Sequence, residues 1–192
     1  MKKHIYTWFF MSVCGWKIEG PFPTHHSKMV LMVLPHTHWF DFFLGLFTRG
    51  IVGVDMHWVG KKELFRFPFG AYFRWMGGRP LDRRGNQNLV ESMVELFKNS
   101  SELRLAIAPE GTRKKVHQLK TGFYYVALGA QVPIVPVAFD FKAKAVRFGA
   151  PFIPTGNYED DLPQLLAHFK GAMGKIPAYT FETAQSNDTP QQ

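Results

Sequence analysis

The chain has 192 residues, 46% of them hydrophobic, so it is long enough for one well-packed domain and too short for two. Lysine and arginine number 23 against 15 aspartates and glutamates, and the resulting charge of +8 favours an anionic partner such as a lipid surface, a phosphorylated substrate or a nucleic acid. The aromatic content of 16% excludes a disordered protein, and a lone cysteine, Cys14, excludes a disulfide framework and a cysteine-based metal site.

The N-terminal stretch 6–16 is rich in aromatic residues and follows Lys2 and Lys3. It is too short to span a bilayer, and it lacks the small residues of a typical secretory cleavage site. Aromatic side chains flanked by lysines suit the membrane–water interface. Residues 1–23 are therefore predicted to form an interfacial segment, and packing of the same side chains on the domain core is the alternative.

Residues 24–180 are predicted to form one α/β domain, because short apolar runs alternate with segments of helical spacing. Buried strands are expected at 29–34 and 103–108, with one more at 145–148. The apolar run 132–139 carries Pro133 and Pro136, which predicts an edge or irregular strand. Helices are predicted over 40–47, 61–76 (broken or kinked at Pro68), 88–97, 122–129 and 162–173. The polar tail 181–192 is expected to be disordered.

The run 35–41, Pro-His-Thr-His-Trp-Phe-Asp, directly follows the first predicted strand. The carboxyl ends of strands are where open α/β sheets commonly hold their sites. In the favoured interpretation, His36 is a general base and Asp41 is the carboxylate that orients its imidazole. In the alternative, His36, His38 and Asp41 are the metal ligands of a hydrolase, although Asp41 stands one residue late for a His-x-His-x-Asp pattern.

Arginines concentrate in two further segments. Residues 77–84 place three arginines after two glycines, and arginine is suited to bidentate phosphate binding. Residues 107–113, Ile-Ala-Pro-Glu-Gly-Thr-Arg, leave the second predicted strand and bring a carboxylate, a hydroxyl and a guanidinium to the same kind of strand end. Taken alone, either segment is also compatible with an ordinary solvated turn.

Together with 132–136, these segments resemble the glycerolipid acyltransferase family of the 1-acylglycerol-3-phosphate acyltransferase type. That family carries a His-x4-Asp block, a Gly-rich block ending in Arg, a Pro-Glu-Gly-Thr-Arg block and a Val-Pro-Ile-Val-Pro block, in the order found here at 36–41, 77–83, 109–113 and 132–136. The resemblance runs from about residue 33 to 140 and points to a short bacterial branch. It implies a single domain with a mixed sheet flanked by helices, as in glycerol-3-phosphate acyltransferases.

The resemblance also implies a role for each matching residue. His36 would deprotonate the acceptor hydroxyl with Asp41 as its partner, and the oxygen would attack an acyl thioester directly, so Cys14 is not the expected nucleophile. No metal and no cofactor are expected. His38 stands where the family usually has Ser, and it is expected to pack or to make a polar contact. The acceptor's phosphate would be bound by Arg83, Glu110, Gly111, Thr112 and Arg113, with Glu110 as a brace for the arginines and Lys120 adding charge nearby. The acyl chain would be lined by Val132, Pro133, Ile134, Val135 and Pro136.

The activity implied by the resemblance is transfer of a fatty acyl group from acyl-ACP or acyl-CoA to the sn-2 hydroxyl of a lysophosphatidic-acid-like acceptor in phospholipid biosynthesis. Peripheral attachment to the cytoplasmic face of the cell membrane is expected, through the N-terminal segment and the aromatic stretch 64–76. A different lyso-lipid acceptor, with an amino or sugar group, is the nearest alternative. A non-enzymatic basic module is another, but the arginines cluster beside a base and an acid rather than in a stripe with aromatics, so no nucleic-acid partner is expected.

Overall fold

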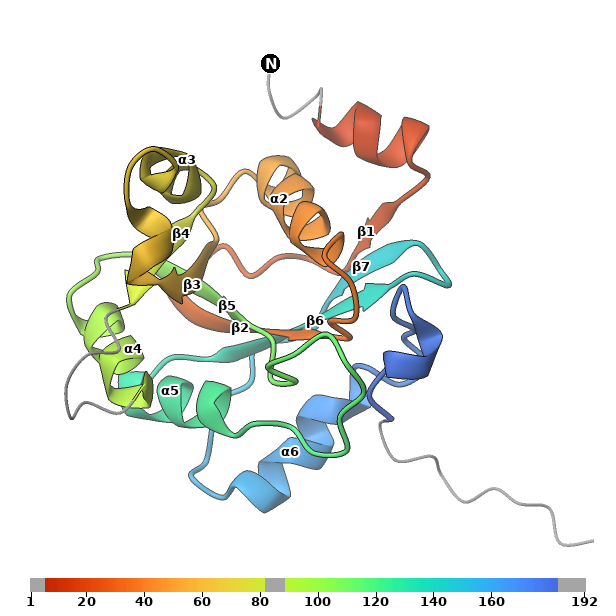
Figure 1. Cartoon of the computed structure of the whole chain (residues 1–192). Helices are drawn as coiled ribbons and strands as arrows, with labels where there is room; N and C mark the ends of the chain where they lie inside the picture. Colours follow the sequence, from red (N-terminus) through yellow and green to blue (C-terminus); the bar gives the residue numbers. More distant parts are fainter. Residues whose placement is uncertain (1–5, 82–88, 183–192) are drawn as a thin grey trace, which may run out of the picture.

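A seven-stranded mixed sheet forms the centre of the molecule (Figure 1). The computed structural model describes residues 6–81 and 89–182. The strand order is β1-β7-β6-β2-β5-β3-β4; β6 and β7 are antiparallel, and all other neighbours are parallel. The strands are β1 (Lys17–Glu19), β2 (Lys28–Leu34), β3 (His57–Lys61), β4 (Gly78–Leu81), β5 (Leu103–Ile107), β6 (Ile134–Asp140) and β7 (Ala145–Phe148). The predicted α/β class and mixed sheet are confirmed.

Helices cover both faces of this sheet (Figure 1). One face carries the π-helical turn η1 (Trp8–Val13), α2 (Asp41–Val52) and α3 (Gly70–Trp75), and the other carries α4 (Leu89–Lys98), α5 (Gly122–Ala130) and α6 (Tyr158–Ala167). Two short 3₁₀ turns, η2 (Lys62–Phe65) and η3 (Pro177–Tyr179), complete the described elements. No helix within residues 6–81 and 89–182 is long and apolar enough to cross a bilayer.

The central strand β2 divides the core into two parts. Its alternate residues Met29, Leu31 and Val33 pack with α2 and η1, whereas the intervening residues pack with α4, α5 and α6. A strand buried on both faces needs a continuous apolar sequence, and the predicted strand 29–34 has one. The carboxyl end of β2 therefore leaves the core at a fixed place, directly before His36.

Several predicted elements differ in extent from those observed. The helix expected over 61–76 is divided into η2 and α3, with Pro68 between them, where a ring without an N–H cannot continue a helix. The last helix begins four residues before the predicted start and ends at Ala167. The predictions omitted β1, β3 and β4, which are short and contain glycine, proline or charged residues.

The strand β6 corrects one expectation: it lies between β7 and β2 and is buried along its whole length, so it is not an edge strand. Pro133 precedes the strand and leaves its ladder intact. The carbonyl of Pro136 accepts the N–H of Gly149 at 2.8 Å, just past the end of β7. The N–H that Pro136 lacks would face the same point, one residue beyond the regular pairing of 137–140 with 145–148, so that part of the ladder is left intact.

Part of the predicted N-terminal segment belongs to the domain. Phe10 and Trp16 are buried in the core beside α2, and β1 pairs with β7. The remaining apolar side chains of this turn are exposed: Trp8, Phe9, Met11 and Val13. The alternative of packing on the core is confirmed for Phe10 and Trp16, and an interfacial position of the exposed side chains stays a prediction. The tail beyond residue 182 lies outside the described residues.

Candidate active site

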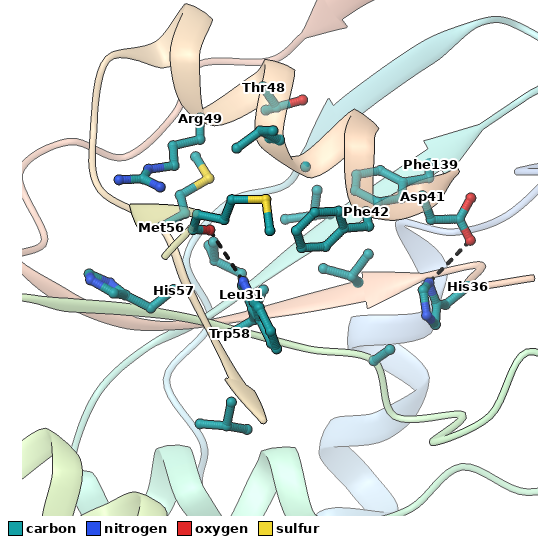
Figure 2. Close-up of a pocket in the computed structure, with 18 of the residues that line it drawn as sticks. Leu31, His36, Asp41, Phe42, Thr48, Arg49, Met56, His57, Trp58 and Phe139 are labelled. Carbon is teal, nitrogen blue, oxygen red and sulfur yellow. Dashed lines mark hydrogen bonds and ion pairs between the residues drawn. The ribbon is translucent and has the colours of Figure 1, made fainter. Parts of the chain in front are cut away.

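A hydrogen-bonded pair of side chains stands at the carboxyl end of β2. His36 Nδ1 lies 3.1 Å from Asp41 Oδ2, and the backbone N–H of His38 donates to the same oxygen at 2.9 Å (Figure 2). Asp41 is the first residue of α2, where a carboxylate complements the helix dipole, and its side chain is fully buried. Because an ionised carboxylate only accepts, Nδ1 of His36 carries the proton, which leaves the lone pair of Nε2 free to take another.

A second carboxylate supports the histidine from the loop after β5. The backbone N–H of His36 donates to Glu110 Oε2 at 2.6 Å, across 74 residues of sequence. Burial raises the pKa of Glu110 to about 7, and the charge of Asp41 adds to this, although the His36 N–H favours the ionised form. Glu110 was expected to brace the arginines. Within the described residues, its hydrogen bond instead fixes the histidine loop.

Two buried oxygens of this arrangement retain free acceptor capacity. Asp41 Oδ1 and Glu110 Oε1 are both without a hydrogen-bond partner among the described residues. Buried carboxylate oxygens are normally satisfied, and exceptions concentrate where a ligand or water completes the set. These oxygens are therefore consistent with a site that a hydroxyl-bearing substrate enters.

His38 has a local structural role. Its Nδ1 accepts the backbone N–H of Phe40 at 3.1 Å, and its ring lies 5.2 Å from that of Trp39, centroid to centroid. This is the polar contact that was expected for it. Over residues 6–81 and 89–182, no group of three or more His, Cys, Asp or Glu side chains is arranged to hold a metal ion. The alternative of His36, His38 and Asp41 as metal ligands thus has no support in this geometry.

The predicted phosphate-binding residues fall into two groups. Arg113 lines the same pocket as His36 and Asp41, and it is exposed at the surface together with Gly111 and Thr112. Gly111 has a φ of 64°, a backbone conformation that favours glycine. A Cβ built there would lie 2.7 Å from Lys120 Nζ, so Lys120 is close to this turn, as predicted. Arg83 lies outside the described residues.

A largely apolar pocket of about 520 Å³ extends from His36 between α2 and the sheet. Its size falls within the range of small-molecule and acyl-chain sites. Figure 2 shows His36 and Asp41 at one end and Arg49 and His57 at the other. The apolar lining consists of Leu31, Val33, Phe42, Leu46, Met56, Trp58, Val59, Phe73, Met76, Ala106, Ala108, Val137, Phe139 and Phe148. Gly45 of α2 also faces this space, since a Cβ there would meet nothing within 4 Å.

The predicted acyl-lining residues do not line this pocket: Val132, Pro133, Ile134, Val135 and Pro136. Ile134 belongs to the core cluster on the opposite face of the sheet, and Val135 is covered completely. Along β6, the open positions on the α2 face are instead Val137 and Phe139, nearer the carboxyl end. Side chains alternate between the two faces along β6, and the pocket lies toward the carboxyl end of the strand. Val137 and Phe139 therefore line it in place of residues 132–136.

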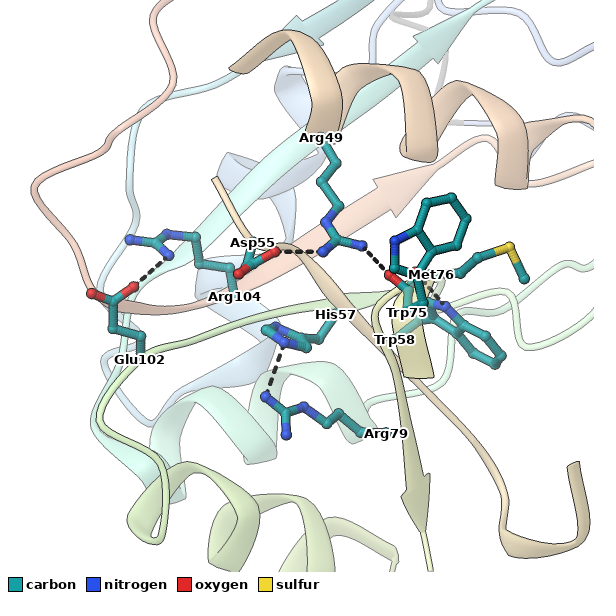
Figure 3. Close-up of polar contacts among 9 residues, drawn as sticks. All are labelled: Arg49, Asp55, His57, Trp58, Trp75, Met76, Arg79, Glu102 and Arg104. Carbon is teal, nitrogen blue, oxygen red and sulfur yellow. Dashed lines mark hydrogen bonds and ion pairs between the residues drawn. The ribbon is translucent and has the colours of Figure 1, made fainter. Parts of the chain in front are cut away.

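The far end of the pocket is polar and lies at the amino ends of β3 and β4 (Figure 3). Arg49 of α2 donates to Asp55 and, at 3.1 Å, to the carbonyl of Trp75, and Arg79 lies 3.0 Å from His57 Nε2. Burial, reinforced by the charge of Arg79, lowers the pKa of His57 to about 4, so this imidazole is neutral at pH 7. Sequence reasoning missed this end wall.

One signal could have found the pocket from the sequence: the isolated Gly45 within the apolar helical pattern that became α2. A glycine inside a helix costs stability, so it usually has a packing or functional reason. His57 and Arg49 carried no comparable signal, since neither stands in a motif.

Comparisons with known proteins agree with this arrangement. The sequence model of the family described as Acyltransferase matches residues 16–140. The 1-acyl-sn-glycerol-3-phosphate acyltransferase of Escherichia coli (strain K12) is 26% identical over 89% of this chain and 79% of that protein. The protein of the same name from Salmonella typhimurium is 29% identical over 68% of this chain and 61% of its own length.

The fold is also similar to that of a solved structure. The crystal structure of the 1-acyl-sn-glycerophosphate (LPA) acyltransferase PlsC from Thermotoga maritima superposes with a TM-score of 0.53, at 18% identity, and covers 91% of this chain and 78% of that one. At this identity the likeness concerns the fold alone, and it supports the arrangement of sheet and helices described above.

Proposed function

Because the chain belongs to the Acyltransferase family, we propose that it transfers a fatty acyl group from a thioester donor to the sn-2 hydroxyl of a lysophosphatidic-acid-like acceptor in phospholipid biosynthesis. The observation that carries this proposal is the His36–Asp41 pair at the mouth of an apolar pocket that Arg113 also lines. A base, an apolar channel and a cation in one place are what acyl transfer to a phosphorylated lipid requires.

In the proposed reaction, Nε2 of His36 takes the proton of the acceptor hydroxyl as the oxygen attacks the thioester carbonyl. The new C–O bond forms, the C–S bond breaks, and the imidazolium returns its proton to the leaving thiolate. Asp41 stabilises the imidazolium through the 3.1 Å contact with Nδ1. The step needs no covalent acyl-enzyme, and Glu110 keeps the His36 backbone in place through its 2.6 Å bond.

The acceptor's phosphate is proposed to bind Arg113 and the turn of Glu110, Gly111 and Thr112, with Arg83 contributing on the strength of the sequence motif. The acyl chain is proposed to lie between α2 and the sheet, where 14 apolar side chains and Gly45 surround it in place of the segment 132–136. Acyl-ACP and acyl-CoA are both anionic donors, and a chain of net charge +8 attracts either.

Peripheral attachment to the cytoplasmic face of the cell membrane is proposed for the face that carries η1, α2 and α3. Large apolar side chains are exposed there, including Trp8 on η1 and Phe67, Phe69, Tyr72 and Trp75 in and before α3. Arg66 and Arg74 lie in the same stretch and favour anionic headgroups. An acyl pocket that opens beneath this face would receive lipid directly from the bilayer surface.

The decisive experiment is acyl transfer by the purified full chain, with an acyl thioester and lysophosphatidic acid in detergent or vesicles, followed as free thiol and diacyl product. His36→Ala is expected to lower kcat by the ~10²–10⁴-fold of a lost general base. His25→Ala, an exposed histidine away from the pocket, is the matched control. Turnover that survives His36→Ala would contradict the mechanism. Turnover with amino- or sugar-headed lyso-lipids, and none with lysophosphatidic acid, would mean that the acceptor is one of those lipids.

A further inference from the structure

The segment that follows α6 returns to the loop that holds His36. We call residues 173–180 the C-terminal strap. It begins beside the end of β6, where the N–H of Phe141 donates to the carbonyl of Met173 at 2.8 Å. Three residues later, the N–H of Ile176 donates to Thr37 Oγ1 at 3.2 Å. The strap lies beyond residues 16–140, the part that matches the family model.

Thr37 is held tightly by this strap. It stands between His36 and His38 and is 2% exposed, a rare environment for a hydroxyl residue in a loop. Gly174 packs directly against it, and a Cβ on Gly174 would lie 2.6 Å from both Oγ1 and Cγ2 of Thr37. Real Cβ atoms do not approach so closely, so the strap reaches Thr37 only because residue 174 has no side chain.

The strap makes two further contacts with the active-site loops. Lys175 places its ammonium 4.6 Å from the ring centroid of Phe40, the residue before Asp41, within the range of a cation–π interaction. Lys115, two residues after Arg113, donates to the carbonyl of Thr180 at 2.9 Å. The strap is closed on itself by the N–H of Gly174, which donates to Thr180 Oγ1 at 3.0 Å.

We infer that the C-terminal strap positions the base, with Thr37 as the positioning residue through which it acts. This inference rests on the proposed role of His36. The side chain of His36 is aligned by Asp41, and its N–H is held by Glu110. On its carbonyl side, the chain continues into Thr37, whose hydroxyl accepts a hydrogen bond from the strap. A base must stay within a few tenths of an ångström of its productive geometry, and small displacements cost rate rather than binding.

Two substitutions at one position separate this role from simple stability. Thr37→Val keeps the shape and removes the hydroxyl that accepts the Ile176 N–H, whereas Thr37→Ser keeps the hydroxyl. We expect Thr37→Val to lower kcat by about tenfold with the acceptor KM within about twofold of the wild type. Thr37→Ser is expected to remain within about twofold in both. Thr155→Val is the matched control, because the Thr155 hydroxyl, in the loop before α6, binds Asp161 of that helix.

Amide hydrogen exchange tests the same inference without any substrate. In Thr37→Val, the amides of residues 36–41 should exchange several-fold faster, while the control Thr155→Val leaves their exchange unchanged. Gly174→Ala disturbs the contact of Gly174 with Thr37 from the strap side and should also accelerate exchange in the His36 loop. This second variant allows the test to be made if Thr37→Val folds poorly. Unchanged exchange at 36–41, with kcat within twofold of the wild type, in both Thr37→Val and Gly174→Ala would overturn the inference. So would an equal loss of kcat in Thr155→Val. If the wild type fails to acylate lysophosphatidic acid, the proposed function falls, and the exchange result still decides the role of the strap.

Discussion

Oδ2 of Asp41 serves two donors of one loop: it lies 3.1 Å from His36 Nδ1 and accepts the backbone N–H of His38 at 2.9 Å. The five-residue spacing produces this because the loop turns into α2 between the two residues, and Asp41 is the first residue of the helix. The carboxylate thus fixes both the imidazole and the backbone beside it. The His-x4-Asp spacing is common by chance in sequences, but here the turn brings the two side chains into contact.

Asp41→Asn should therefore retain the fold and lose the reaction. The amide has the same shape but no charge to stabilise an imidazolium, and its oxygen is a weaker acceptor for two donors. We expect kcat to fall at least ~10²-fold with the acceptor KM changed little, as for other residues that act through a general base. Steady-state kinetics measure this, and Asp160→Asn on the exposed side of α6 is the control. A loss confined to KM would place Asp41 in substrate binding instead.

Glu110→Gln should change how stability depends on pH. The pKa of Glu110 is about 7 in the folded chain against an ordinary 4.5, so the folded state holds its proton more tightly between those values. Stability from this group is therefore present at low pH and falls as the pH rises through 4.5 to 7. Glutamine removes that loss, because it stays neutral.

We expect the free energy of unfolding of Glu110→Gln, relative to the wild type, to rise by about 1–3 kcal/mol from pH 4 to pH 8. Urea denaturation at each pH measures it, and Glu159→Gln, at an exposed carboxylate in the first turn of α6, should show no such rise. A difference that does not vary with pH would mean that folding leaves the pKa of Glu110 unchanged.

Gly45→Leu should shorten the acyl chain that the pocket accepts. A Cβ at this position meets nothing within 4 Å, so a larger side chain has room to enter the space between α2 and the sheet. Leucine also favours the helix over glycine by about 0.8 kcal/mol, so Tm should not fall. Competition between acyl thioesters of different length measures the preference, with Gly45→Ala as the intermediate step. An unchanged length profile in both variants would move the acyl chain out of this pocket.

The pairing of His36 with Asp41 could be predicted from the sequence, because both residues lie in one turn next to a continuous apolar strand. The contact of Glu110 with His36 was beyond it, since the two residues are 74 positions apart and meet only because β2 and β5 are neighbours in the sheet. The strand β6 was misjudged for a related reason. Proline disrupts a central strand through the ladder bond that its missing N–H would make, and Pro136 stands one residue outside the regular pairing of β6 with β7.

The lining of the pocket could not be predicted from the motif, because a motif marks a strand but not the side-chain direction along it. The segment 132–136 was expected to line the pocket, whereas the open positions are Val137 and Phe139 together with residues of α2 that no motif identifies. A pocket between a helix and a sheet is the space that the side chains of the two elements do not fill. The position of that space depends on tertiary packing, as the free space beside Gly45 illustrates.

Removal of two aromatic side chains before and within α3 should weaken binding to lipid vesicles. Phe67 is 97% exposed and Trp75 is 65% exposed, on the face that carries α2 and η1. Each ring that enters the bilayer interface contributes on the order of 1–2 kcal/mol, and a change of 1.4 kcal/mol is tenfold in affinity. We therefore expect the double variant Phe67→Ser/Trp75→Ser to bind anionic vesicles at least tenfold more weakly in sedimentation assays. Its activity on a micellar short-chain acceptor should be retained, because neither side chain lines the pocket.

The control is Tyr125→Ser/Ile153→Ser, which removes two exposed apolar side chains elsewhere on the surface. Equal weakening by the control pair would show that exposed apolar area in general, rather than the α3 face, governs attachment.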